Sequence, residues 1–272
     1  LDPAALSALA NVNANDDITL AAIVDTDVAT VLSALAIASN ADVTMTSAIS
    51  AADLDTIANA TTGEVTATIS DGAVAATLGA IGNVGTGDTI TFTTTDTTAD
   101  ASDLVALGAK VDTFTTTNVT TITEAAASIG TSAATVTDAL ALAANAAVTI
   151  TNAISAANLD TIANATTGVV TATIAADTAL SDATVTAVGN VGAGDSITLA
   201  STVTTADATA LVALNTLADT KSFNNVATIT EAAASIGTNA ATVTDALAIV
   251  PNAAVTITGA ISAANLDIIA NA

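Results

Sequence analysis

Internal repetition constrains this chain more than any other feature of its sequence. Residues 49–63 (ISAADLDTIANATTG) and 154–168 (ISAANLDTIANATTG) are identical at 14 of 15 positions, at an offset of 105 residues. Residues 261–272 (ISAANLDIIANA) begin a third copy, and residues 121–151 match residues 228–258 at 27 of 31 positions. This long period predicts stacked structural repeats rather than one globular core.

The repeats predict a single continuous array over all 272 residues, without separate domains. The expected repeats span 1–48 (partial), 49–153, 154–260 and 261–272 (partial). The sequence starts and finishes on helical patterns that lack a strand on their outer side. We therefore expect the array to continue, either in a longer polypeptide or by end-to-end stacking of subunits.

A shorter period lies inside each long repeat. Runs of alternating threonine and aliphatic residues recur every 22 to 30 residues. The ten runs begin at residues 18, 43, 65, 89, 119, 148, 170, 196, 226 and 255. Strict alternation with β-branched residues predicts strands with one buried and one exposed face.

The segments between these runs change to helical spacing. An apolar stripe at the spacing of an amphipathic helix is formed by Val28, Val31, Leu32 and Leu35. Serines stand at the expected starts of three related helices, as Ser50, Ser155 and Ser262. Ser50 precedes Asp53 by three residues, as in a capping box. The repeating element is therefore strand, turn, helix, turn.

Stacked copies of this element predict an α/β fold with one parallel sheet of about ten strands, backed by a layer of helices. Connections between parallel strands are nearly always right-handed. The expected fold is therefore a right-handed α/β solenoid resembling leucine-rich repeats. An all-β solenoid is the alternative.

The composition argues against catalysis. The sequence contains no His, Cys, Tyr or Arg, which supply most general bases and nucleophiles. Paired carboxylates could in principle hydrolyse glycosides, but sugar-binding clefts usually use aromatic platforms, and three Phe are the only aromatic residues. We expect no enzymatic activity and no organic cofactor.

The charge limits the partners. The chain has 26 acidic and 2 basic residues, a net charge of −24. Such a surface cannot neutralise phosphates, so nucleic acid is excluded, and anionic membranes repel it. No apolar run reaches the length that spans a bilayer, so membrane insertion is not expected. The acidity favours salt-rich or calcium-containing surroundings outside the cell or on its surface.

Calcium is the one metal that the sequence suggests, because it takes oxygen ligands from Asp and Asn. The predicted ligands, all in turns, are Asp25, Asp27, Asp88, Asp96, Asp100 and Asp195, with Asp16, Asp17 and Asp103 beside them as further members of the same clusters. The alternative is that these aspartates cap helices and form turns.

Exposed threonines are the most regular surface feature that the sequence predicts. They are Thr44, Thr46, Thr66, Thr68, Thr149, Thr151, Thr171, Thr173, Thr256 and Thr258. Threonine is a good uncharged strand former on an exposed face, which explains the pattern without a ligand. The alternatives are a subunit-packing face, an O-glycosylated face, or a face that binds ice or a glycan.

Segments such as VTTITEAAASIGTSAATVTDALALAANAAVTITNAISAANLDTIANATTG (119–168) resemble the repeats of very large surface and hemolysin-type proteins of bacteria, especially marine cyanobacteria. The resemblance implies an extracellular fibrous or surface-layer protein, often with calcium-dependent export or assembly. We therefore expect a structural repeat protein that forms a filament, surface layer or adhesin stalk by associating with copies of itself. A binding module that uses the threonine face is the alternative.

Overall fold

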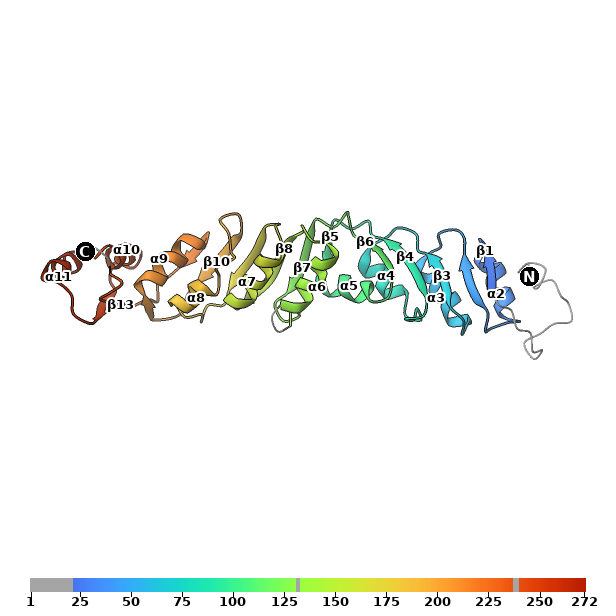
Figure 1. Ribbon diagram of the computed structural model, residues 1–272, viewed down its shortest axis with the longest axis horizontal. Coiled ribbons are helices and arrows are strands. Elements are labelled where there is room, and N and C mark those ends of the chain that lie inside the picture. The colour runs from blue at the N-terminus through green and yellow to red at the C-terminus, as the bar shows by residue number, and fades with distance from the viewer. Residues whose placement is uncertain (1–21, 131–132, 237–239) are drawn as a thin grey trace. The chain divides into compact units, whose positions relative to one another are not determined.

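The computed structural model describes residues 22–130, 133–236 and 240–272, in which strands and helices alternate along the chain (Figure 1). The strands pair in parallel, so the predicted α/β fold with parallel sheets and helices is confirmed. The all-β alternative is wrong, because this part of the chain contains ten helices as well as its strands. The strand predicted at residue 18 lies outside the described residues.

The strands are β1 (Ala22–Asp25), β2 (Asp42–Met45), β3 (Val65–Thr68), β4 (Thr89–Thr93), β5 (Thr98–Asp100), β6 (Thr113–Thr115), β7 (Thr121–Ala125), β8 (Ala147–Ile154), β9 (Val170–Ile174), β10 (Ser196–Ala200), β11 (Thr205–Asp207), β12 (Thr220–Ser222), β13 (Thr228–Ala232) and β14 (Ala254–Thr258). The helices are α2 (Val28–Leu35), α3 (Ala51–Ala60), α4 (Val74–Ala80), α5 (Ala101–Gly108), α6 (Ala134–Leu142), α7 (Ala156–Ala165), α8 (Asp182–Thr186), α9 (Ala208–Leu217), α10 (Ala241–Ile249) and α11 (Ala263–Ala270).

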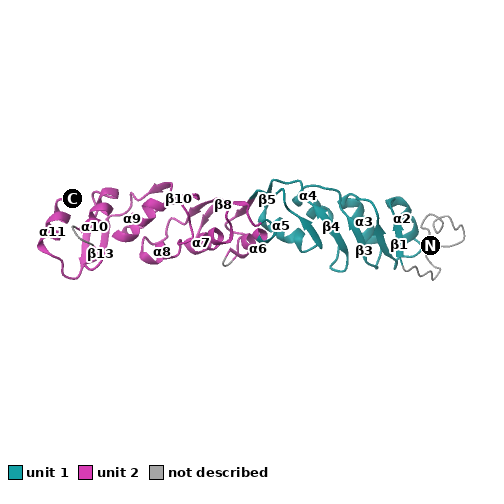
Figure 2. Cartoon of the chain, turned by 45° about the horizontal axis from the view of Figure 1, so that its top comes forward, with its two compact units in different colours: residues 1–121, 141–143 teal, residues 122–140, 144–272 magenta. Residues whose placement is uncertain are grey.

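The chain divides into two compact units (Figure 2). Unit 1 comprises residues 1–121 with 141–143, and unit 2 comprises 122–140 with 144–272. Unit 1 contains the sheet order β1-β2-β3-β4-β6. In unit 2, strands β12-β10-β9-β8-β7 lie side by side, and β11-β13-β14 form a separate sheet. The prediction of one sheet of about ten strands is therefore wrong.

A turn centred on a hydroxyl explains this error. The run predicted from residue 89 (TITFTTT, 89–95) is longer than β4, and its last two residues belong to a bend that leads to the short strand β5. Between them, buried Thr94 donates from Oγ1 to the Gly72 carbonyl at 3.1 Å and accepts from the Asp96 N–H at 3.1 Å. Ser201 repeats this turn between β10 and β11, where it accepts from the Val203 N–H at 3.2 Å. Because threonine suits both strands and such turns, the alternating pattern hides the bend.

Aligned aliphatic rows form the core. In unit 1, Ile23 pairs with Val43 and Val43 pairs with Val65, and all three are at most 1% exposed. Phe92 pairs with Phe114 in the same sheet, with 5.7 Å between ring centroids. The buried side chains of neighbouring strands thus pack against one another in rows, as expected for stacked repeats.

Hydroxyl caps start three helices of nearly the same sequence. The Ser50 Oγ accepts from the Asp53 N–H at 3.1 Å and also donates to the Asp53 carboxylate. Ser155 and Ser262 cap α7 and α11 through the N–H of the residue three positions later. The predicted helix starts are confirmed, and each cap satisfies an N–H that has no partner inside the helix.

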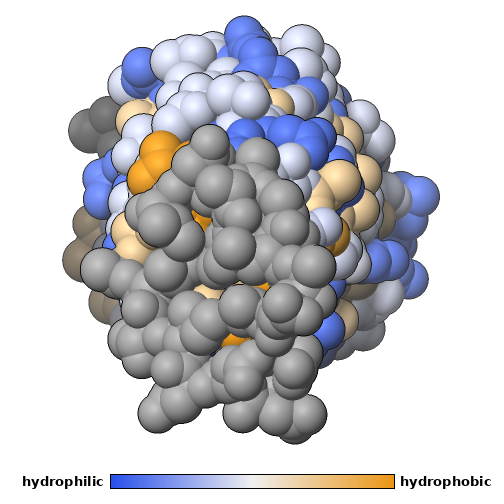
Figure 3. All heavy atoms as spheres, turned by 90° about the vertical axis from the view of Figure 1, so that its right-hand side faces the viewer, coloured by the Kyte–Doolittle hydropathy of each residue, from blue (hydrophilic) through white to orange (hydrophobic). Residues whose placement is uncertain are grey.

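The surface carries little positive charge. Lys110 and Lys221 are the two basic residues of the sequence. Viewed from the right-hand side of Figure 1, hydrophilic residues in blue and pale colours lie beside apolar residues in tan and orange (Figure 3). Lys110 donates to the carbonyls of Ile81 and Val84, just after α4, and Lys221 donates to a carbonyl near the end of α9. These positions suit a cation at the negative end of a helix. No helix in the described ranges is long and apolar enough to cross a bilayer.

Candidate functional site

Two predicted metal ligands, Asp88 and Asp195, join the start of a strand to a Gly-x-Gly turn. Asp88 accepts from the Val65 N–H through Oδ1 and from the Gly85 N–H through Oδ2, both at 2.8 Å. Asp195 makes the same pair of bonds in unit 2, at 2.8 and 2.9 Å. Charge-assisted bonds to backbone N–H groups explain why aspartate occupies both positions.

The other four predicted ligands also accept backbone N–H bonds. Asp27 and Asp100 cap α2 and α5. Asp25 accepts from the next two N–H groups, and Asp96 accepts from the Val74 N–H at 2.7 Å. Among residues 22–130, 133–236 and 240–272, no three acidic side chains gather into a group that could hold a metal ion. Asp16 and Asp17 lie outside those ranges.

A buried glutamate in β13, which contacts the start of α9, was not predicted. Glu231 is 4% exposed, and its Oε2 accepts from the Thr209 N–H at 3.1 Å and from the Thr209 hydroxyl at 2.8 Å. Glu124, its counterpart one repeat earlier, is 3% exposed. Alternation along TITEA places this glutamate on the same face as the buried isoleucine, which is the sequence signal for its burial.

Two aspartate caps have pKa values shifted in opposite directions. Burial raises the pKa of Asp207, the N-cap of α9, and the negative charges of Glu231 and Asp182 act in the same direction. The Thr30 hydroxyl, followed by the Thr30 N–H, lowers the pKa of Asp27. The two groups should therefore affect stability oppositely as the pH changes.

We expect Asp207→Asn and Asp27→Asn to change the pH dependence of unfolding with opposite signs. A raised folded-state pKa contributes stability that is present at low pH and is lost as the pH rises through that pKa. A lowered one contributes stability that is present above the unfolded pKa and is lost as the pH falls through the folded value. Urea unfolding between about pH 3 and 7 measures both, since ordinary Asp titrates in that interval. Parallel curves for the two variants would contradict the assignment.

Threonines form rows across adjacent strands. Thr44 pairs with Thr66 and Thr66 with Thr89, while Thr68 pairs with Thr91 and Thr91 with Thr113. Thr149 pairs with Thr171 in unit 2. Neighbours in such rows stand about 4.8 Å apart across strands. Of the predicted threonines, Thr44, Thr66, Thr149 and Thr173 are half-buried, and Thr46, Thr68, Thr151, Thr171, Thr256 and Thr258 are exposed.

A backbone clasp holds successive strand–helix modules together, where a module is one strand with the helix that follows it. In unit 1, the Gly63 N–H donates to Thr61 Oγ1, and this hydroxyl donates to the Ala41 carbonyl at 2.7 Å. A Cβ on Gly63 would lie 2.5 Å from that carbonyl oxygen. We call this contact the Thr-x-Gly clasp.

The clasp recurs in unit 2 with the same geometry. Thr166 Oγ1 donates to the Ala146 carbonyl at 2.8 Å, and a Cβ on Gly168 would lie 2.5 Å from the same oxygen. Gly63 and Gly168 each follow the end of a helix, α3 and α7, where glycine is common as a stop signal. The close backbone approach is a further role, which spacing alone did not reveal.

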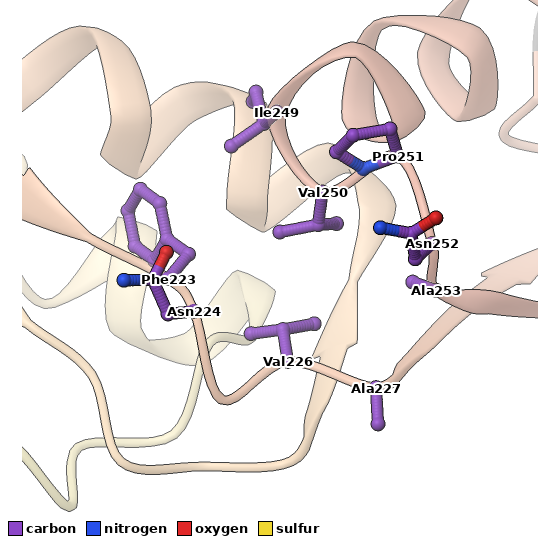
Figure 4. Close-up of a pocket in the computed structure, with 9 residues that line it drawn as sticks. All are labelled: Phe223, Asn224, Val226, Ala227, Ile249, Val250, Pro251, Asn252 and Ala253. Atoms are coloured by element: carbon purple, nitrogen blue, oxygen red, sulfur yellow. The ribbon is translucent and has the colours of Figure 1, made fainter.

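The module β14–α11 repeats β8–α7, but its apolar residues are less buried. Leu159 of α7 is fully buried, whereas its counterpart Leu266 in α11 is 57% exposed. None of the α11 residues is buried. Beside this module, residues of the β12–β13 and α10–β14 connections line a hollow of about 320 Å³, among them Phe223, Val226 and Val250 (Figure 4).

No family model, curated protein or solved structure matches this chain. Function is therefore inferred from three features of its own geometry. These are the rows of threonine, the Thr-x-Gly clasps and the less buried β14–α11 module.

Proposed function

We propose that the chain is a structural scaffold segment that associates with copies of itself, as part of a filament, surface layer or adhesin stalk. The Thr-x-Gly clasps, which join strand–helix modules in the same way in both units, support this most strongly. Modules that stack through one repeated contact form an array that further modules can extend.

The finer geometry that we propose is a right-handed α/β solenoid within each unit. Modules that are neighbours in sequence are also neighbours in space. The strand order β1-β2-β3-β4 in unit 1 follows the chain, and α2, α3 and α4 contact one another in the same order. Parallel strands joined through helices favour a right-handed connection.

The proposed location is outside the cell or on its surface. A net charge of −24 causes copies to repel one another at low ionic strength. High salt or divalent cations would reduce this repulsion and so favour assembly. The proposal includes no catalytic role, no nucleic-acid partner and no membrane insertion.

Electron microscopy of the purified chain tests the proposal. At high salt with calcium we expect extended assemblies, and their loss in chelator would show that the cation bridges chains. Discrete single chains under all these conditions would contradict the scaffold role. Single chains that shape ice crystals, and lose this activity in Thr149→Tyr, would instead favour a binding function for the threonine rows.

A further inference from the structure

Three acidic residues of unit 2 come together at the start of α9, each from a different module. Leu180 forms a parallel bridge with Ala206 and accepts a backbone hydrogen bond from Asp207 at 2.9 Å. Asp182, the first residue of α8, follows Leu180 by two positions. β11 pairs in turn with β13, which contains Glu231. The strand pairing therefore stacks Asp182, Asp207 and Glu231 on three neighbouring levels of unit 2.

Two of these carboxylates hold successive N–H groups of α9. The Asp207 Oδ1 accepts from the Ala210 N–H at 3.0 Å, and the Glu231 Oε2 accepts from the Thr209 N–H at 3.1 Å. Glu231 is 4% exposed and belongs to the following module. The positive end of a helix favours a negative charge beside it. Two carboxylates that are partly shielded from water also repel each other, so their charges are not simply additive in their favour.

No lysine balances this charge in the described part of unit 2. Its one lysine, Lys221, donates to a carbonyl near the opposite end of α9. α9 itself carries no charged residue, and α10, which packs against α9, carries Asp245, another acid. The charged groups that act on Asp207 are therefore negative, namely Glu231 from β13 and Asp182 from α8. A partly buried carboxyl among like charges binds a proton more readily.

Asp207 is the member of the cluster that takes up a proton. Burial raises its pKa most, and the charges of Glu231 and then Asp182 raise it further. Glu231 accepts three hydrogen bonds, and a proton on its carboxylate would displace one of the donors. Asp182 is particular to this repeat, because Ala75 stands at the same position one repeat earlier. The additional carboxylate favours proton uptake in unit 2.

We propose that this cluster is a proton-linked joint, in which Asp207 loses its proton as the pH rises and the start of α9 loosens against β13. Loss of the proton adds a negative charge beside Glu231, so the two carboxylates repel each other across the contact that joins two modules. A raised folded-state pKa contributes stability that is present at low pH and is lost as the pH rises through that pKa. The joint goes beyond the scaffold role and does not depend on it, because it gives unit 2 a local packing that responds to acidity.

Amide hydrogen exchange of the full chain, followed residue by residue by NMR between about pH 3 and 7, tests the proposal. Protection factors remove the intrinsic pH dependence of exchange. The protection factor of the Ala210 amide should fall at least about twofold as the pH rises. In Asp207→Asn, which keeps an N-cap oxygen without the charge, this fall should disappear. In Asp182→Asn the fall should be smaller, because one of the two neighbouring charges is gone.

The Thr30 amide of α2 is a control in the same spectra. Its cap, Asp27, has a lowered pKa, so the protection of this amide should rise with pH. If Asp207→Asn does not fold, Asp207→Ser supplies another uncharged N-cap for the same comparison. Ala210 protection that stays constant or rises with pH in the wild type overturns the proposal. A fall as large as that of the wild type in the Asp207 variant or in Asp182→Asn overturns it as well.

Discussion

Replacing Gly63 with alanine should lower the free energy of unfolding by about 3 kcal/mol. The added Cβ would lie 2.5 Å from the Ala41 carbonyl oxygen and 2.6 Å from its carbon. Both atoms belong to the backbone just before β2, so they cannot move aside without disturbing the strand. The clasp through Thr61 would lengthen at the same time, because the Gly63 N–H donates to that hydroxyl.

The matched control is Gly87→Ala in the Gly-x-Gly turn of the same unit. A Cβ on Gly87 would meet nothing within 4 Å. Alanine also restricts the unfolded chain, so this substitution should be neutral or slightly stabilising. Urea unfolding of both variants measures the difference. Equal stabilities would show that Gly63 is present for turn flexibility and not for the close approach to Ala41.

Replacing Glu231 with alanine should destabilise the chain by about 3 kcal/mol, through lost bonds and a cavity. The carboxylate accepts three hydrogen bonds, two from Thr209 and one from the Ala232 N–H at 2.7 Å. At 4% exposure, water cannot replace it as the partner of these donors. The start of α9 would then contain an N–H group that lacks its acceptor.

Glu64→Ala is the control for this prediction. Glu64 is exposed and accepts a hydrogen bond from the Thr89 hydroxyl at 2.8 Å. Its loss should cost less than about 1 kcal/mol, since water can replace it. Denaturant unfolding of both variants tests the contrast. If Glu231→Ala is as mild as Glu64→Ala, the buried carboxylate does not stabilise the helix start.

The sequence predicted the local elements better than their assembly. The helical stripe on Val31 and Leu35 is buried as expected, and Ser50 caps its helix. These features depend on spacing within a few residues. The break into several sheets depends on the turns at Thr94 and Ser201, where each hydroxyl accepts from the N–H two residues later.

The candidate site was predicted only in part. The aspartates were located in turns, but one of the two backbone N–H groups that donate to each of Asp88 and Asp195 belongs to a strand more than 20 residues away. The Thr-x-Gly clasp was not predicted, because the contact of Gly63 with Ala41 joins two modules. Contacts between modules require knowledge of the strand register, which the repeat period gives only approximately.

Sedimentation equilibrium at high salt tests the scaffold role most directly. The wild-type chain should show a mass that rises with concentration, whereas Leu266→Asp, with its charge on the exposed face of α11, should remain at the mass of one chain. Val169→Asp is the control, because Val169 is 48% exposed and lies in a clasped module. It should associate like the wild type. A wild-type mass that stays at one chain at every concentration, or equal loss of association in both variants, would contradict self-association through the β14–α11 module.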